Sequence, residues 1–145
     1  MSETVWKFEH TVECDAPQEF AWEYWTNPAK WDDPPARFEF DGPFAAGTSI
    51  RTILPGQTLE SVIREVKKPD TALIEMEFAG AYVRFRWKFE KLDAGRTKIT
   101  QTMSLSGDRA SGLVDQARTL EHSVPAGMTK IAERIEEGWK EINSC

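Results

Sequence analysis

The chain is poor in cysteine and has no long apolar run. Its 145 residues include two cysteines, Cys14 and Cys145, which make no disulfide framework. Cys145 is the last residue, and a chain end is held too loosely to favour a native bridge. No apolar run approaches the ~20 residues that span a bilayer, and the first residues lack the basic and apolar regions of a secretion signal. These absences predict a cytoplasmic protein that does not insert into a membrane.

Positive charge is also scarce. Lysine and arginine number 18 against 24 acidic residues, which gives a formal net charge of −6. Nucleic acids and anionic membranes select basic patches, so neither is expected as a main partner. The local group Arg84, Arg86 and Lys88 alternates with apolar residues, and we interpret it as a solvated strand face.

The motifs of metal and nucleophilic catalysis are missing as well. The two histidines, His10 and His122, lie far apart, and no Cys/His spacing of the zinc type occurs. No glycine-rich phosphate loop follows a strand, and no nucleophile elbow is present. The acidic pair Asp32 and Asp33 precedes two prolines and is interpreted as part of a turn before it is considered a site. The sequence therefore predicts no metal and no cofactor.

What the chain has is alternation of apolar and polar residues over seven segments, the pattern of antiparallel strands with one dry face. We expect strands at residues 5–13, 36–40, 48–54, 58–67, 73–79, 82–92 and 97–106. In the segment 58–67 the apolar positions change from one face to the other, which predicts a bulge or a strong twist.

Two further segments have helical spacing. Asp15 is placed to cap a first helix, which buries Phe20 and Trp25 and ends near residue 27. A long helix is expected over 124–143, with Ser123 as its N-cap and Pro125 in its first turn. One apolar stripe runs along it at spacings of three and four: Met128, Ile131, Ile135, Trp139 and Ile142. The segment 107–122 is either an early part of this helical region or a flap beside it.

Four stretches of the chain carry a family resemblance. They are residues 16–22 (APQEFAW), 27–31 (NPAKW), 41–48 (DGPFAAGT) and 96–100 (RTKIT). With the order strand, helix, six strands and helix, they resemble the START-like (SRPBCC) helix-grip superfamily, and within it the bacterial polyketide cyclase/dehydrase-like branch. The resemblance implies a single START-like domain over residues 1–145. It implies an α+β helix-grip fold, in which a seven-stranded curved antiparallel sheet wraps around the long C-terminal helix, with one or two short helices after the first strand.

The resemblance also implies an apolar cavity between sheet and helix, with a mouth near the segment after the first helix and near 107–120. The predicted ligand-binding walls are Phe8, His10, Ile74, Met76, Phe78, Phe85, Trp87, Gln101, Met103, Met128, Ile131 and Ile135. Trp6 and Trp87 are the better candidates for ligand neighbours, whereas Trp22, Trp25, Trp31 and Trp139 fit helix packing. Because an empty void of ~300 Å³ would cost ~7 kcal/mol, either the aromatic side chains fill this space or water and a ligand do.

Three functions remain open. The first is a non-catalytic carrier or sensor that binds a small hydrophobic or aromatic molecule, as a monomer or weak homodimer. The second is a polyketide cyclase or dehydratase-like enzyme in which His10 acts as catalytic acid or base, although the favoured interpretation of His10 is a core histidine with one satisfied hydrogen bond. The third is a protein-partner-binding module like the heat-shock ATPase activator branch, which would expose an apolar patch.

Overall fold

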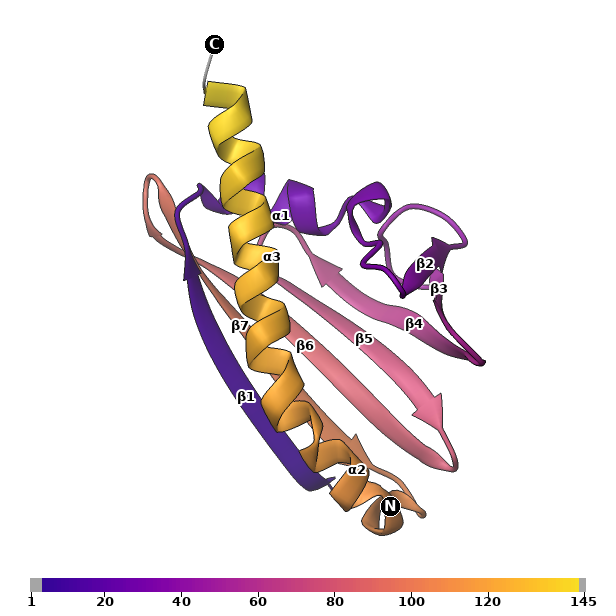
Figure 1. Ribbon diagram of the computed structural model, residues 1–145. Helices are drawn as coiled ribbons and strands as arrows, with labels where there is room; N and C mark the ends of the chain where they lie inside the picture. Colours follow the sequence, from indigo (N-terminus) through magenta and orange to yellow (C-terminus); the bar gives the residue numbers. More distant parts are fainter. Residues whose placement is uncertain (1–3, 144–145) are drawn as a thin grey trace.

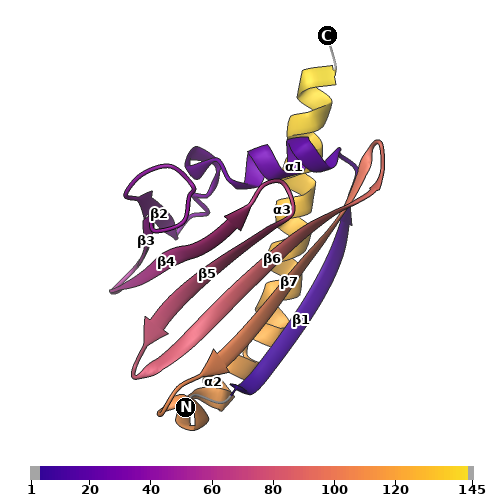
Figure 2. The same cartoon turned by 180° about the vertical axis from the view of Figure 1, so that it is seen from behind.

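A computed structural model describes residues 4–143 and shows a curved sheet with a long helix against its concave face (Figure 1). Seen from behind, the sheet lies in front of that helix, so the molecule has two layers (Figure 2). Cys145, and with it the expectation about a bridge to Cys14, lies outside the described residues. Within residues 4–143, no helix combines the length and the apolar character needed to cross a membrane.

The sheet has seven strands in the order β1-β7-β6-β5-β4-β3-β2, and every neighbouring pair is antiparallel. The strands are β1 (Thr4–Cys14), β2 (Arg37–Phe40), β3 (Ser49–Leu54), β4 (Gln57–Lys67), β5 (Thr71–Phe78), β6 (Ala81–Asp93) and β7 (Arg96–Ser106). This arrangement confirms the predicted helix-grip fold. The register of β4 against β5 shifts between Ile63 and Glu65, which confirms the predicted irregularity in that strand.

The helices are α1 (Gln18–Trp25), η1 (Pro28–Lys30), η2 (Ala110–Leu113), α2 (Val114–Arg118) and α3 (Leu120–Asn143). The prediction that Asp15 caps α1 is wrong, because the cap position is taken by Pro17 without a side-chain hydrogen bond. The Asp15 carboxylate instead pairs with Arg96 at 3.3 Å, and its backbone N–H donates to Glu136 at 2.8 Å. These contacts tie the end of β1 to β7 and α3.

The predicted start of the C-terminal helix is also wrong. Helix α3 begins at Leu120, so Pro125 lies inside the helix and not in its first turn. The helix starts earlier because its first turn makes contacts with residues that are distant in the sequence. Glu121 accepts a hydrogen bond of 2.7 Å from the indole of Trp6, and Leu120 packs against the buried cluster around the same tryptophan. These contacts hold one turn of helix ahead of the proline.

The core divides into two clusters along the groove between sheet and α3. One contains Trp22, Trp25 and Phe89 near α1, and the other contains Trp6 and Leu105 near α2. Two half-buried side chains pack against both clusters, namely Phe85 and Val124. The interior is therefore continuous, with Phe85 at the junction.

The three cations on β6 lie on an exposed face, as expected. Arg84 Nε lies 2.8 Å from a Glu75 oxygen, and Arg86 and Lys88 each lie 3.9 Å from the nearest glutamate oxygen. Ion pairs of this kind on an exposed sheet face contribute little to stability.

Candidate ligand-binding site

The sheet register brings three of the predicted wall residues into one row. His10 lies opposite Gln101 in the β1–β7 pairing, and Gln101 lies opposite Trp87 in the β7–β6 pairing. Gln101 and Trp87 are buried, and His10 is half-buried. Neither the His10 nor the Gln101 side chain makes a hydrogen bond to another residue of the described chain.

The next row fills the middle of the groove. Phe8 faces Met103, Met103 faces Phe85, and Phe85 faces Ile74 across four neighbouring strands. All four belong to the predicted cavity wall, and none of them lines either of the two pockets described below. On either side of this row there is hollow space. The predicted cavity is thus divided in two.

The first hollow, which we call the flap pocket, lies beneath α2 and encloses about 250 Å³. It is lined by Trp6, Gln57, Leu59, Met76, Phe78, Val83, Leu105, Leu113, Gln116, Ala117 and Leu120. Met76 and Phe78 are predicted wall residues, and Trp6 is a predicted ligand neighbour. The segment 107–122 therefore covers this pocket with short helices that run into α3.

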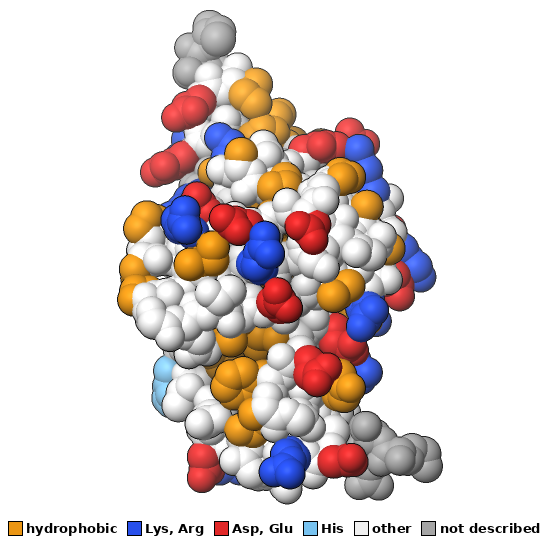
Figure 3. All heavy atoms as spheres, turned by 90° about the vertical axis from the view of Figure 1, so that its right-hand side faces the viewer, with side chains coloured by type: hydrophobic (Ala, Val, Ile, Leu, Met, Phe, Trp, Pro, Cys, Tyr) orange, Lys and Arg blue, Asp and Glu red, His pale blue; other side chains and the backbone are white. Residues whose placement is uncertain are grey.

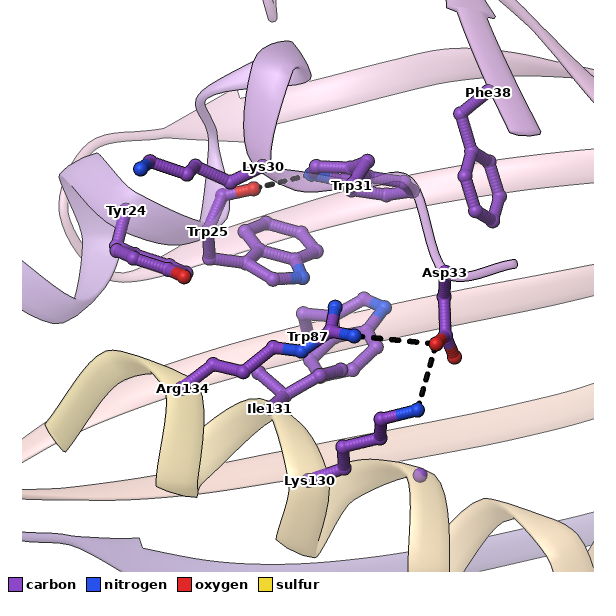
Figure 4. Close-up of a pocket in the computed structure, with 11 residues that line it drawn as sticks. Tyr24, Trp25, Lys30, Trp31, Asp33, Phe38, Trp87, Lys130, Ile131 and Arg134 are labelled. Carbon is purple, nitrogen blue, oxygen red and sulfur yellow. Dashed lines mark hydrogen bonds and ion pairs between the residues drawn. The ribbon is translucent and has the colours of Figure 1, made fainter. Parts of the chain in front are cut away.

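The second hollow, which we call the aromatic pocket, lies between α1, the segment after it, β6 and α3 (Figure 4). It also encloses about 250 Å³ and is lined by Tyr24, Trp25, Lys30, Trp31, Asp33, Phe38, Trp87, Gly127, Lys130, Ile131 and Arg134. Trp87 and Ile131 are predicted wall residues. Its apolar walls come from side chains on α1, β2, β6 and α3, together with Trp31, which follows η1.

Trp25 fixes the geometry of these walls. Its ring centroid lies 4.9 Å from that of Trp87, 5.7 Å from that of Trp31 and 5.3 Å from that of Phe89. Trp31 in turn meets Phe38 edge-on at 5.4 Å and donates its indole N–H to the carbonyl of Trp25. Tilted and edge-on contacts of this kind hold aromatic rings in defined orientations. The pocket is consequently preformed by packing.

Charged groups lie along one side of the aromatic pocket. Lys130 Nζ donates a hydrogen bond of 2.7 Å to Asp33 Oδ1, and Arg134 Nη2 donates to the same oxygen at 3.2 Å. The hydrogen bond from Lys130, with the positive charges of Lys130 and Arg134, holds the pKa of Asp33 below its usual value. Asp33 is therefore a carboxylate at neutral pH. No group of three or more metal-binding side chains occurs in the described part of the chain.

Comparison with models of protein families identifies the family of this chain. The family model "Polyketide cyclase / dehydrase and lipid transport" matches residues 5–136. The chain belongs to this family. None of the curated protein sequences matches it significantly.

Solved structures with the same fold are distant in sequence. Norcoclaurine synthase from Thalictrum flavum, in complex with dopamine and hydroxybenzaldehyde, matches with a TM-score of 0.72 at 16% identity, over 92% of this chain and 88% of that chain. The structure of Ara h 8.0201 matches with a TM-score of 0.67 at 19% identity, over 94% and 98% of the two chains. A protein from Arthrobacter aurescens matches with a TM-score of 0.63 at 20% identity, over 93% and 86%. At these identities the likeness establishes the fold shared with the polyketide cyclase/dehydrase family, and nothing about activity.

Within this family fold, the remaining predicted wall residues lie in the core. Met128 and Ile135 point from α3 into the buried cluster near α1, at 2% and 0% exposure. Whether any predicted residue touches a ligand stays a prediction.

Most of the aromatic pocket is not predicted from the sequence. The sequence predicts that Trp25 and Trp31 pack helices, and both also line the pocket. Their spacing alone does not separate a ring that only packs from one that packs and also borders a hollow. Two signals were available: cations at positions 130 and 134 lie on one face of a helix, and Asp33 follows the tryptophan at position 31 closely.

Proposed function

We propose that this chain binds a compact hydrophobic or aromatic molecule in the aromatic pocket and serves as a non-catalytic carrier or sensor. The observation that carries the proposal is a preformed hollow of about 250 Å³ with five aromatic side chains in its wall. Sites for small organic molecules are concave and mostly apolar, with a few polar groups that fix orientation. Asp33, Lys130 and Arg134 are polar groups of that kind.

The size of the pocket favours a small ligand. Ligand sites commonly enclose ~300–1,000 Å³, and this pocket lies just below that range. At ~30 Å³ for each water in the liquid, its 250 Å³ corresponds to about eight waters. A compact aromatic group fits such a volume, which is small for a sterol-sized molecule.

The comparisons support a ligand-binding role in general terms. The matching family model is described as covering polyketide cyclases, dehydrases and lipid transport, all of which handle hydrophobic or polyketide compounds. The norcoclaurine synthase structure was obtained with dopamine and hydroxybenzaldehyde, which are aromatic compounds. A similar fold therefore accepts aromatic molecules in another protein.

The other two functions have less support. A general acid or base must reach the substrate, but His10 is absent from the lining of the aromatic pocket and lies two strands away from Trp87. A partner-binding module would expose a broad apolar patch. On the face seen in Figure 3, hydrophobic side chains lie in small groups among charged ones. The large exposed apolar residues of the described chain are spread over four elements: Val5 on β1, Phe78 on β5, Tyr82 and Leu92 on β6, and Ile142 on α3.

The direct test is native mass spectrometry of the freshly purified protein, followed by denaturation of the same sample. A retained small molecule that is released on unfolding is expected, and its mass identifies the ligand class. If the protein is bare, a thermal-shift screen of aromatic and acyl compounds follows. The proposal fails if no compound of either kind raises the melting temperature.

Gly127 offers a variant that separates binding from folding. It lies on α3 at the pocket wall, and a Cβ added there meets no atom within 4 Å. Gly127→Leu therefore places a branched side chain at the pocket, while both Gly127→Leu and Gly127→Ala gain helix propensity of about 0.5–1 kcal/mol. We expect both variants to melt above the wild type and only the leucine variant to lose at least about tenfold in affinity. Equal binding by the two variants would contradict the assignment of the pocket.

A further inference from the structure

We propose that the ligand of the aromatic pocket is an aromatic carboxylate, whose acid group Lys130 and Arg134 hold in the position that Asp33 occupies in this structure. The inference rests on the proposed binding function and adds the chemical class of the ligand. It also makes Asp33 an internal competitor for the same two cations.

The charge around the pocket is the first argument. Lys30, Lys130 and Arg134 line the pocket with one carboxylate, that of Asp33, so three positive charges against one negative leave a formal excess of +2. This excess occurs in a chain whose formal net charge is −6. Lys30 lies over the ring of Tyr24, with its Nζ 5.4 Å from the ring centroid, and makes no ion pair with a described residue. An anionic ligand compensates this local charge and a neutral ligand does not.

The second argument is that a carboxylate already lies at the site. Figure 4 shows Asp33 beside the open space of the pocket, with hydrogen bonds from Lys130 and Arg134 to its side chain. The two donors are four residues apart on α3 and so project from the same side of the helix. A guanidinium and an ammonium that converge on one carboxylate oxygen are a site for that group, whichever molecule supplies it.

Both cations also have more N–H donors than their contacts with the chain use. An ammonium has three N–H donors, and the described contact of Lys130 with Asp33 uses one. A guanidinium has five, and Arg134 directs one nitrogen to Asp33 and another to the Asp32 carbonyl at the long distance of 3.5 Å. Their hydrogen-bonding capacity therefore exceeds what the chain itself satisfies.

Asp33 is placed so that it can be exchanged. It lies between η1 and β2 in a short turn closed by backbone hydrogen bonds with Ala36, at 3.1 and 2.8 Å. Its side chain is 45% exposed, so its carboxylate can turn to water while the backbone bonds stay intact. Exposed ion pairs of this kind are weak, and a ligand that also stacks on the tryptophans competes well with them.

The test compares two ligands with the same ring system, 2-naphthoate and 2-naphthamide, by isothermal titration calorimetry at pH 7. The wild type is expected to bind the naphthoate about tenfold more tightly, the factor of one good charge-assisted hydrogen bond. Arg134→Gln and Lys130→Gln should each remove most of this preference, because each weakens the binding of the naphthoate more than that of the amide. Asp33→Asn should tighten naphthoate binding several-fold and change the affinity for the amide less.

Two control variants match these changes in charge. Lys140→Gln removes a cation from the same helix outside the pocket lining, and Glu133→Gln removes an exposed anion from it. Both should leave naphthoate affinity unchanged. If they shift it as much as Arg134→Gln and Asp33→Asn do, the preference is long-range electrostatics and the inference is wrong.

The remaining outcomes separate the inference from the proposed function. Equal affinities for naphthoate and naphthamide would contradict the inference that the ligand is a carboxylate, but they would not contradict the proposed binding function. Weaker naphthoate binding by Asp33→Asn would also overturn it, because Asp33 would then support the pocket rather than compete with the ligand. If neither compound binds, the inference fails, whereas the thermal-shift screen of aromatic and acyl compounds decides the binding function.

Discussion

Burial decides the chemistry of Cys14. The side chain is fully buried at the end of β1, and its Sγ lies 3.6 Å from the carbonyl oxygen of Ala132 on α3. Burial raises the pKa of the Cys14 thiol to about 12, and the negative charges of Glu136 and Asp15 add to the rise. The residue therefore behaves as a small core side chain and not as a nucleophile.

The thiol should consequently be inert in the folded protein. In a Cys145→Ser background, which leaves Cys14 alone, about one thiol in ten thousand is ionised at pH 8 if its pKa is about 12. We expect an aromatic disulfide reagent to label the native protein negligibly within the time that labels the urea-unfolded chain completely. Rapid labelling of the native protein would show that this end of the core is open.

Single residues also mark the limit of what sequence conveys. Asp15 has the residue type and position of a helix cap, yet it pairs with Arg96, 81 residues further along the chain. The alternation of β1 places His10 on the inner face, but it does not reveal that Gln101 lies opposite. Local patterns determine which way a side chain points, and the partner it meets depends on the assembled sheet.

At the scale of elements, the strands follow from alternation because the period of two is a local property. Even the shift in β4 is visible as a change of apolar face, and it occurs between Ile63 and Glu65. The start of α3 does not follow in the same way. Ser123 and Pro125 have the signature of a helix N-terminus, and a hydrogen bond between Trp6 and Glu121, 115 residues apart, overrides it.

Replacement of Pro125 tests where α3 begins. In a helix that starts at Leu120, proline at this position lacks an N–H for the carbonyl of Glu121, and alanine restores that donor. Pro125→Ala should therefore raise the free energy of unfolding by about 1 kcal/mol or more, since proline is ~3 kcal/mol less favourable than alanine inside a helix and its stiffening of the unfolded chain offsets part of this.

The comparison is made by urea unfolding of the two proteins. Alanine at the first turn of a helix has no such advantage. An unchanged or lower free energy of unfolding would therefore mean that the helix begins after the proline.

At the scale of the whole molecule, the fold could be predicted and the shape of its cavity could not. A sheet around one amphipathic helix implies a groove. The division of that groove by the row from Phe8 to Ile74 depends on the register of four strands. The aromatic pocket depends further on how α1, the turn at Asp33 and α3 meet in space. Each of these segments is short and has no sequence motif of its own, so the site can be identified only once the segments are assembled in the fold.

The central claim is that the aromatic pocket is the ligand site, and ¹⁹F NMR of protein labelled with 5-fluorotryptophan tests it most directly. Of the six tryptophans, Trp25, Trp31 and Trp87 line the aromatic pocket, and Trp6 lines the flap pocket. On titration with 2-naphthoate, with resonances assigned by single Trp→Phe variants, we predict that those of Trp25, Trp31 and Trp87 shift in a saturable manner while those of Trp6 and Trp139 stay in place. A saturable shift confined to Trp6 would move the site to the flap pocket, and six unmoved resonances would contradict the account.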